Sequence, residues 1–176
     1  MITYKSLVED DINRELFHGF VRHQVVTKCL RKEDGEWTIK DAPFIDDWSE
    51  EEYQFLVKCL KNTVSTGGFV YAAFENNIIK GFVSVEPKIF GGENKYNDLS
   101  CIHVSEDMRG KGIGKKLFLA AKEWAKKNGA KKLYISSHSA VETQAFYKAM
   151  GCVDAQQYEK SHVEREPFDR QLECLL

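Results

Sequence analysis

The feature that most constrains this chain is a glycine-rich turn between an apolar strand and a strongly amphipathic helix. The turn is Arg109-Gly-Lys-Gly-Ile-Gly-Lys115, with glycine at every second position from 110 to 114. Glycine allows positive φ and removes the side chain, so backbone N–H groups here can approach a ligand closely. The first N–H groups of the following helix lack intrahelical partners and lie at the positive end of its dipole. Together with Arg109, Lys111 and Lys115, they predict an anion site that suits a diphosphate.

Two common phosphate-binding motifs do not fit this turn. A Walker loop needs four residues between its first glycine and a Gly-Lys-Ser/Thr sequence, whereas Gly110 is too close to Gly114 and Lys116 stands at the Ser/Thr position. The dinucleotide pattern G-x-G-x-x-G requires a third glycine, and Leu117 stands there. The spacing therefore leaves two interpretations of the turn. It binds a diphosphate of another kind of ligand, or it is a plain turn with solvated lysines.

The bulk composition is that of an ordinary globular protein. The chain has 176 residues, of which 43% are hydrophobic and 30% charged, with a formal net charge of -2. This predicts one domain over residues 1–176 and no general attraction for nucleic acid or an anionic membrane. The first residues lack the apolar core of a signal peptide, so we expect a cytoplasmic protein without a membrane segment. The five cysteines form no C-x-x-C pair, which predicts reduced thiols and no metal site.

The apolar periodicity predicts an α/β (or α+β) domain with a mixed sheet, an antiparallel first half and helices covering the sheet. Strands are expected at residues 2–7, 69–74, 78–85, 98–104, 133–136, 156–162 and 171–175. Helices are expected from Asp10 or Asp11 through Phe20, from the Ser49 capping box to about Val64, and over residues 112–127 and 141–150. Gln24–Trp48 shows no clear period, so we expect a functional loop or an irregular lid there.

Arg109-x-x-Gly112-x-Gly114 resembles the Q/R-x-x-G-x-G/A signature of the GNAT superfamily of N-acetyltransferases. The surrounding order of strand, signature, helix, strand and helix is also similar, and the last helix contains Phe146-Tyr147-Lys-Ala-Met-Gly, as the family's does. The resemblance covers residues 69–152 well, and the first 68 residues match only in element order. It implies a GNAT-like acyl-CoA N-acyltransferase fold, in which helices flank a mostly antiparallel central sheet with splayed strands.

The resemblance also implies acetyl-CoA as co-substrate and no metal. By position, the backbone of Ile102, His103 and Val104 would pair with the pantetheine arm in the gap between the splayed strands, much as a peptide adds to a sheet edge. The pyrophosphate would lie against the turn that follows Arg109, which comprises Gly110, Lys111, Gly112, Ile113, Gly114 and Lys115.

Acetyl transfer to an amine needs a neutral amine, a polarised thioester carbonyl and a proton for the leaving thiolate. The resemblance makes Tyr147 the general acid, although it could also be a core aromatic residue. Asp98 is the first candidate for the base, because some GNAT histone acetyltransferases carry a catalytic glutamate there; it could equally cap a strand. Glu86 is the alternative base. His103 could titrate usefully and Cys101 could act as a nucleophile, but a packed or surface histidine and a reduced core thiol are the favoured interpretations.

This chain departs from the family at one coenzyme contact. Many relatives have an asparagine seven residues before the tyrosine, and here Ala140 stands at that position. Either Ser139 or His138 could replace the asparagine, or the contact is absent.

The acceptor of a GNAT enzyme usually lies between the first helices and the far edge of the sheet, so the segment Gln24–Trp48 is the region of interest. Asp46, Asp47 and Trp48 would suit a cationic amine through charge and a cation–π face. A pocket for a mixed or anionic acceptor could equally be shaped by Trp37, Phe44, Arg22 and Arg31.

We therefore expect an N-acetyltransferase that moves the acetyl group from acetyl-CoA to a small-molecule primary amine by direct transfer in a ternary complex. A non-catalytic acyl-CoA sensor and an enzyme that acetylates a protein amine are the alternatives. A homodimer through the C-terminal strand or through residues 24–48 is compatible with the sequence.

Overall fold

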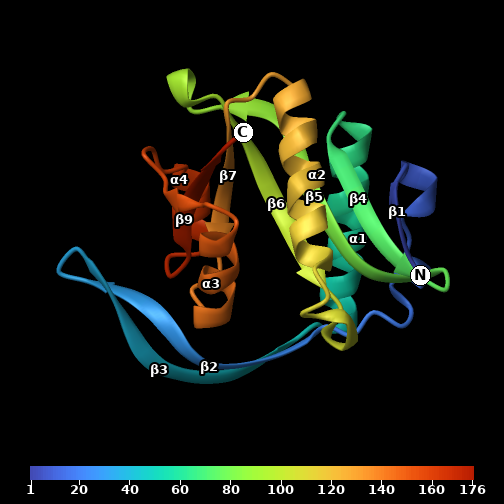
Figure 1. Ribbon diagram of the computed structural model, residues 1–176, viewed down its shortest axis with the longest axis horizontal. Helices are drawn as coiled ribbons and strands as arrows, with labels where there is room; N and C mark the ends of the chain where they lie inside the picture. Colours follow the sequence, from blue (N-terminus) through green and yellow to red (C-terminus); the bar gives the residue numbers. More distant parts are fainter.

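The computed structural model describes residues 1–176, and a seven-stranded sheet of order β1-β4-β5-β6-β7-β9-β8 forms its centre (Figure 1). The β6–β7 pair is parallel, and the other neighbours in this sheet are antiparallel. The strands are β1 (Ile2–Ser6), β4 (Phe69–Glu75), β5 (Ile78–Phe90), β6 (Tyr96–Val104), β7 (Lys132–Ser137), β8 (Val153–Asp154) and β9 (Arg170–Leu175). This is the mixed, mostly antiparallel sheet that the sequence predicts.

Helices cover both faces of the sheet. They are α1 (Glu50–Ser65), α2 (Ile113–Lys127), α3 (Val141–Ala149) and α4 (Lys160–Arg165), and none is long and apolar enough to span a membrane. The predicted capping box begins α1: Ser49 Oγ accepts from the N–H of Glu52 at 3.2 Å, and Glu52 Oε2 accepts from the N–H of Ser49 at 2.7 Å. This satisfies two groups that a helix end would otherwise leave without partners.

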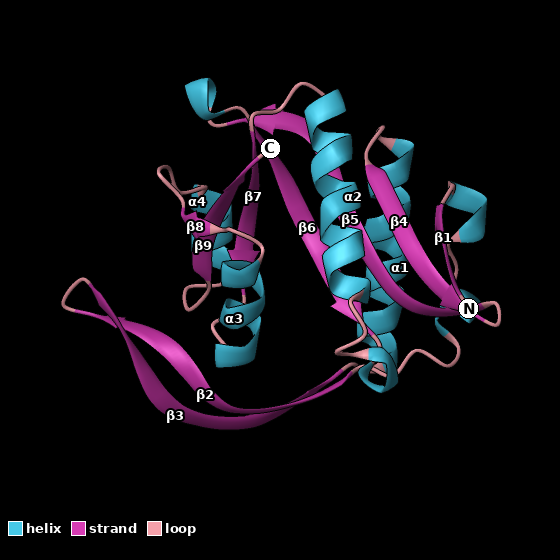
Figure 2. Cartoon of the chain, viewed as in Figure 1, coloured by secondary structure: helices cyan, strands magenta, loops and turns pink.

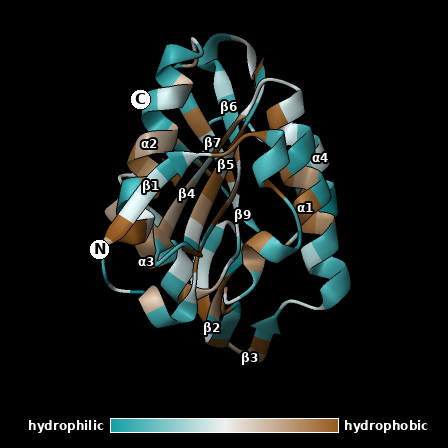
Figure 3. Cartoon of the chain, turned by 90° about the vertical axis from the view of Figure 1, so that its right-hand side faces the viewer, coloured by the Kyte–Doolittle hydropathy of each residue, from teal (hydrophilic) through white to brown (hydrophobic).

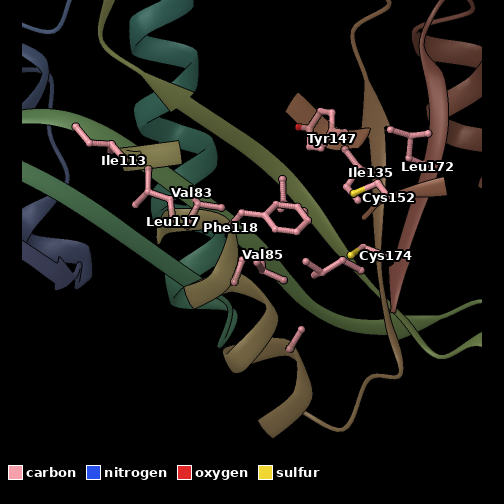
Figure 4. Close-up of a cluster of buried hydrophobic side chains, with 14 of the residues drawn as sticks. Val83, Val85, Ile113, Leu117, Phe118, Ile135, Tyr147, Cys152, Leu172 and Cys174 are labelled. Atoms are coloured by element: carbon pink, nitrogen blue, oxygen red, sulfur yellow. The ribbon is translucent and has the colours of Figure 1, made fainter. Parts of the chain in front are cut away.

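The two largest hydrophobic clusters of the core lie on opposite faces of the sheet. Successive residues of a strand point to opposite faces, and β4 follows this rule: Ala73 joins the cluster under α2, whereas Val70 and Ala72 join the cluster under α1. Figure 3 shows apolar residues concentrated on the inner strands. In the cluster under α2, the Phe118 ring lies between Val83 of β5 and Cys174 of β9 and so links the two halves of the sheet (Figure 4).

The two halves of the sheet separate at β6 and β7. These strands pair at only three positions, the last being Asp98 with Tyr134. Beyond it, β6 stays with β5 and β7 stays with β9, so the remainder of β6 has no strand on its β7 side (Figure 2). The predicted splay is confirmed, and it opens one edge of β6 in the middle of the sheet.

The prediction of an irregular loop at Gln24–Trp48 is wrong. The segment is a long hairpin of β2 (His23–Glu33) and β3 (Glu36–Asp47), closed by Asp34 and Gly35 with φ of 50° and 84°. Positive φ at both central residues is the geometry of a two-residue hairpin turn. Most of the hairpin stands away from the core and is exposed on both faces, so its strands lack the alternation by which a half-buried strand is recognised.

The hairpin runs from the α1 side of the molecule across the open end of the β6–β7 gap to α3 (Figure 1). It is attached there by backbone pairing: the N–H of Leu30 donates to the carbonyl of Ser139 at 2.8 Å, and Cys29 forms a bridge with Ala140. Val26, Cys29 and Ala140 bury one another at this contact. The hairpin therefore ties together the two halves that the splay separates.

Two other predicted elements are also wrong. In place of a helix from Asp10 or Asp11 through Phe20 there are two 3-10 turns, η1 (Glu9–Asp11) and η2 (Glu15–Phe17). Asn13 separates them, because its side chain accepts the N–H of Leu16 at 2.9 Å and competes with the helical bond.

In place of a strand at 156–162 there is an irregular segment followed by α4. The N–H of Gln156 donates to the Glu173 carboxylate at 3.1 Å, and the N–H of Glu159 donates to the Tyr134 hydroxyl at 2.9 Å. Buried side chains thus accept the hydrogen bonds of backbone N–H groups that would otherwise pair with a neighbouring strand.

Candidate active site

A cavity of about 930 Å³ occupies the gap between β6 and β7 and extends beneath the base of the hairpin. One wall is β6 from Leu99 to Val104, and the opposite wall is the end of β7 with α3. The glycine turn closes one side, and Arg22, Asp46 and Trp48 line the hairpin side. Residues from sequence segments far apart therefore share one space because the sheet opens at this point.

The glycine turn has the backbone that an anion site requires. Gly110 and Gly112 have φ of 76° and 78°, and a Cβ atom on either would meet nothing within 4 Å. Both glycines are therefore needed for the backbone conformation, and the space beside them is open. Lys116 is the first residue after them whose backbone N–H is engaged, with the carbonyl of Gly112 at 3.2 Å. The N–H groups at the start of α2 are thus free for a ligand, and a diphosphate fits them.

The side chains of the turn are less uniform than the sequence suggests. Arg109 and Lys115 line the cavity, whereas Lys111 does not. Lys111 Nζ instead lies 3.1 Å from the Met108 sulfur. Gly114 has a packing function, since its Cβ would come within 3.1 Å of the Phe146 ring, so a glycine here lets α2 meet α3.

The free edge of β6 is the second part of the site. Ile102, His103 and Val104 all line the cavity and lie beyond the last residue that pairs with β7. An unpaired strand edge offers its N–H and C=O groups to an extended ligand. The edge therefore fits a long arm with amide groups, leading away from the glycine turn.

Tyr147 lies in the α3 wall of the same cavity. Its ring is buried and packs edge-on against Phe118 and Phe146, with centroids 6.3 Å and 5.2 Å away. Burial raises the pKa of the hydroxyl well above its ordinary value, and the charge of Asp169 adds to this. The hydroxyl is turned away from the Cys152 and Cys174 sulfur atoms (Figure 4). Tyr147 is thus a protonated group facing the gap.

Residues 30–152 match the model of the acetyltransferase (GNAT) family. The chain belongs to the GNAT family. GNAT enzymes use acetyl-CoA as co-substrate, and the glycine turn and the free edge of β6 are the parts of this chain that would hold it. None of the curated protein sequences matches the chain.

Solved GNAT structures share the fold at low sequence identity. A proposed streptothricin acetyltransferase from Bacillus anthracis, in complex with acetyl coenzyme A, is 20% identical with a TM-score of 0.71 over 98% of this chain and 96% of that one. A GNAT acetyltransferase from Staphylococcus aureus is 16% identical with a TM-score of 0.68, over 100% and 99%. Nourseothricin acetyltransferase is 18% identical with a TM-score of 0.65, over 98% and 95%. Nearly the whole chain therefore follows the GNAT architecture.

In this GNAT chain, His103 and Cys101 are packed residues in the cavity wall. The His103 ring lies edge-on to Trp48, with centroids 4.7 Å apart, and burial lowers its pKa to about 3, with Arg22 and Arg109 adding to the shift. Burial raises the pKa of the Cys101 thiol to about 12. The imidazole is neutral and the thiol protonated near neutral pH, which agrees with the interpretation of both as packing residues.

The two carboxylates predicted as bases both lie outside the lining of the GNAT cavity. Asp98 Oδ2 pairs with His162 Nε2 at 2.8 Å. Glu86 Oε1 accepts hydrogen bonds from Thr63 Oγ1 at 2.7 Å and Ser100 Oγ at 2.8 Å. Ser100 lines the cavity, so Glu86 is connected to it through one hydroxyl, whereas Asp98 is engaged with α4.

A carboxylate that the sequence reasoning missed does line the cavity. Asp169, just before β9, accepts a hydrogen bond from Ser136 Oγ at 3.0 Å, and burial raises its pKa. Tyr147 lines the same cavity. No motif surrounds Asp169 in the sequence; the pairing of β9 with β7 brings it to the gap.

The predicted acceptor residues separate into two pairs. Asp46 and Trp48 line the GNAT cavity, whereas Trp37 and Asp47 do not. Trp37 lies farther along the hairpin, with the Arg170 guanidinium 4.8 Å from its ring centroid, and Asp47 pairs with His23 at 2.6 Å. The segment predicted to face the acceptor therefore lines the cavity only at its base.

The position of the family asparagine is covered by the hairpin. Ala140 is fully buried against Cys29, and Ser139 Oγ accepts a hydrogen bond from Arg31 Nη1 at 2.6 Å. His138 lines the cavity, and its Nδ1 accepts the N–H of Ala140 at 3.0 Å, which leaves Nε2 as the donor. Of the two predicted replacements, only His138 faces the space where a coenzyme contact would form.

Proposed function

We propose that this chain is an N-acetyltransferase that transfers the acetyl group of acetyl-CoA directly to the primary amine of a small molecule. The observation that supports this most strongly is that one cavity contains the glycine turn, the free edge of β6, a protonated Tyr147 and the carboxylate of Asp169. A coenzyme site, a proton donor and a proton acceptor are the groups that the reaction requires.

The bound ammonium group first loses one proton, which is released to solvent, and becomes a neutral amine. The amine nitrogen attacks the thioester carbonyl, so a C–N bond forms and the C–S bond breaks. The nitrogen loses its second proton to the base, and the Tyr147 hydroxyl gives its proton to the leaving thiolate. A raised pKa keeps Tyr147 protonated until that step.

We propose Asp169 as the base because it lines the cavity itself. Glu86 acting through Ser100 is the alternative, and it keeps a hydrogen-bonded connection of 2.8 Å to the same space. Asp98 remains a prediction from the family resemblance; its pairing with His162 favours it less.

The charge of the β7 wall supports an amine acceptor. Glu142, Glu166 and Asp169 line the cavity there, and their carboxylates would attract an ammonium group before it loses its proton. Two similar structures are named as acetyltransferases of streptothricin and nourseothricin, which are small molecules rather than protein termini. We therefore propose a small-molecule acceptor over a protein amine.

A thiol-release assay with acetyl-CoA and a panel of amines tests this function. The panel contains cadaverine, spermidine, L-lysine, streptothricin and a lysine-containing peptide. We expect amine-dependent release of the free thiol with at least one small molecule. Saturable binding of acetyl-CoA without turnover would instead identify a sensor, and turnover of the peptide alone would identify a protein acetyltransferase.

Replacing Asp169 with asparagine should lower kcat at neutral pH by roughly a hundredfold, the lower end of the range of general-base catalysis. Only the ionised carboxylate can accept a proton, so wild-type activity should fall as pH drops through the raised pKa of Asp169, and Asp169→Asn should lack this limb. The measurement is a pH–rate profile with rates expressed per concentration of unprotonated amine.

Glu86→Gln is the matched control for this prediction, since it removes a carboxylate connected to the cavity only through Ser100. If Glu86→Gln loses the acidic limb and Asp169→Asn keeps it, the base is Glu86.

A further inference from the structure

Arg22 is a buried cation whose hydrogen bonds are incomplete. Its side chain is 7% exposed and lines the cavity, at the point where the chain enters the hairpin. Asp46 binds it through the carboxylate at Nη2 and the carbonyl at Nη1, the latter at 3.4 Å. A guanidinium has five N–H donors, and the buried Nε has no partner at all. A buried charge is costly when its donors are left without partners.

Arg109 is a second, exposed cation that lines the cavity near Arg22. It lines the same part of the cavity and forms no salt bridge, and its only hydrogen bond in the protein is from Nε to the carbonyl of Val104 at 3.3 Å. Burial lowers the pKa of Arg109, and the charge of Arg22 adds to this. His103, whose pKa burial lowers to about 3, is neutral and adds no charge to the cavity. Asp46, which is itself 30% exposed, is thus the only carboxylate paired with Arg22.

The cavity therefore has two electrically different ends. Arg22 and Arg109 lie at the hairpin and glycine-turn end, and Glu142, Glu166 and Asp169 lie at the β7 end. A ligand with only a positive group would leave the arginine end of the cavity without a negatively charged partner.

The structure assigns to Arg22 the binding of a carboxylate carried by the acceptor itself. The acceptor is then an amine that also bears a carboxylate, with its ammonium toward Asp169 and its carboxylate toward Arg22. The planar fork of arginine matches a carboxylate in geometry as well as charge. This inference rests on the proposed function, because it specifies the acceptor of that reaction.

The coenzyme is the less suitable source of the anion at Arg22. The glycine turn already offers the free N–H groups at the start of α2, with Lys115 beside them. Arg22 lies instead among residues of the other face of the sheet: its guanidinium is 5.1 Å from the Trp48 ring centroid, and Trp48 packs on the cluster under α1. That is the face on which Asp46 and the hairpin base lie.

Calorimetry on the protein saturated with coenzyme A tests this inference without needing turnover. The probes are ω-amino acids from glycine to 6-aminohexanoate together with L-lysine, each compared with the amine that lacks the carboxylate, from methylamine to pentylamine and cadaverine. We expect at least one amino acid to bind tighter than its amine by roughly tenfold to a hundredfold, as charge-assisted hydrogen bonds provide.

Three variants test which residue causes the preference for amino acids over amines. Arg22→Met should abolish it and leave the affinity for coenzyme A within about twofold. Asp46→Asn should strengthen amino-acid binding severalfold, because it removes the competing carboxylate. This increase in affinity tests the inference even if Arg22→Met folds poorly. Arg14→Met, which breaks a surface pair with Glu50 at 2.9 Å, is the matched control and should change nothing.

The inference is wrong if no amino acid binds, if amines bind as well as amino acids, or if Arg22→Met weakens coenzyme A instead. Amino acids that bind tightly but are never acetylated would support the carboxylate site and contradict the proposed function.

Discussion

Replacing Tyr147 with phenylalanine is expected to lower kcat by roughly a hundredfold to a thousandfold, as loss of a general acid does. The ring packs against Phe118 and Phe146, and phenylalanine keeps these contacts while removing the proton that the leaving thiolate needs. The KM for acetyl-CoA should stay within about threefold, because no part of the glycine turn changes. Steady-state thiol release across pH, with both substrates varied, measures the effect.

Tyr71→Phe is the matched control for this prediction. It removes a phenol hydroxyl from a ring that packs against the same cluster but lies outside the cavity, so activity should be unchanged. Full activity and an unaltered pH profile in Tyr147→Phe would show that Tyr147 only packs and that water protonates the thiolate.

Gly112→Ala is expected to weaken acetyl-CoA binding by roughly a hundredfold, because several charge-assisted hydrogen bonds to one anion would be lost together. Gly112 has φ of 78°, where a Cβ atom costs about 1–2 kcal/mol. The added methyl group would also enter the open space beside the first N–H groups of α2. Calorimetry with acetyl-CoA measures the change.

Gly35→Ala separates backbone strain from ligand contact. Gly35 has φ of 84° and nothing within 4 Å of an added Cβ, as Gly112 does, but it lies in the hairpin turn away from the cavity. The free energy of unfolding, measured by urea denaturation, should decrease by a similar amount in both variants. Only Gly112→Ala should also bind the coenzyme more weakly. Equal coenzyme affinities in the two variants would show that the turn does not bind the coenzyme.

Local patterns in the sequence predicted most of the elements that build this site. The helix after Gly112 has a strong apolar period, and the capping box at Ser49 is a local bond between neighbouring residues, so both could be located. The hairpin at β2 and β3 was missed because few of its side chains are buried, and periodicity reports burial rather than strand formation itself. The strand expected at 156–162 was wrong because Tyr134 and Glu173 bind its backbone from across the sheet.

The site residues also divide into those that a local motif predicts and those that only the fold brings to the cavity. The glycine turn and Tyr147 belong to short motifs that can be recognised without knowing any contact. Asp169 has no such motif, and it reaches the cavity only because β9 returns beside β7. The sequence offers Arg22 only as one of several residues that could shape a pocket. Its burial against Asp46, which the fold produces, is what supports a specific role for it.

The sequence by itself predicted a glycine turn of the GNAT type and an anion site there, because spacing, glycine and helix dipole act over a few neighbouring residues. Only the tertiary structure decided which carboxylates and cations face that turn across the cavity. Those groups come from segments more than a hundred residues apart, from Arg22 to Asp169. The contacts that set their charge and orientation are made in space, where no local pattern records them.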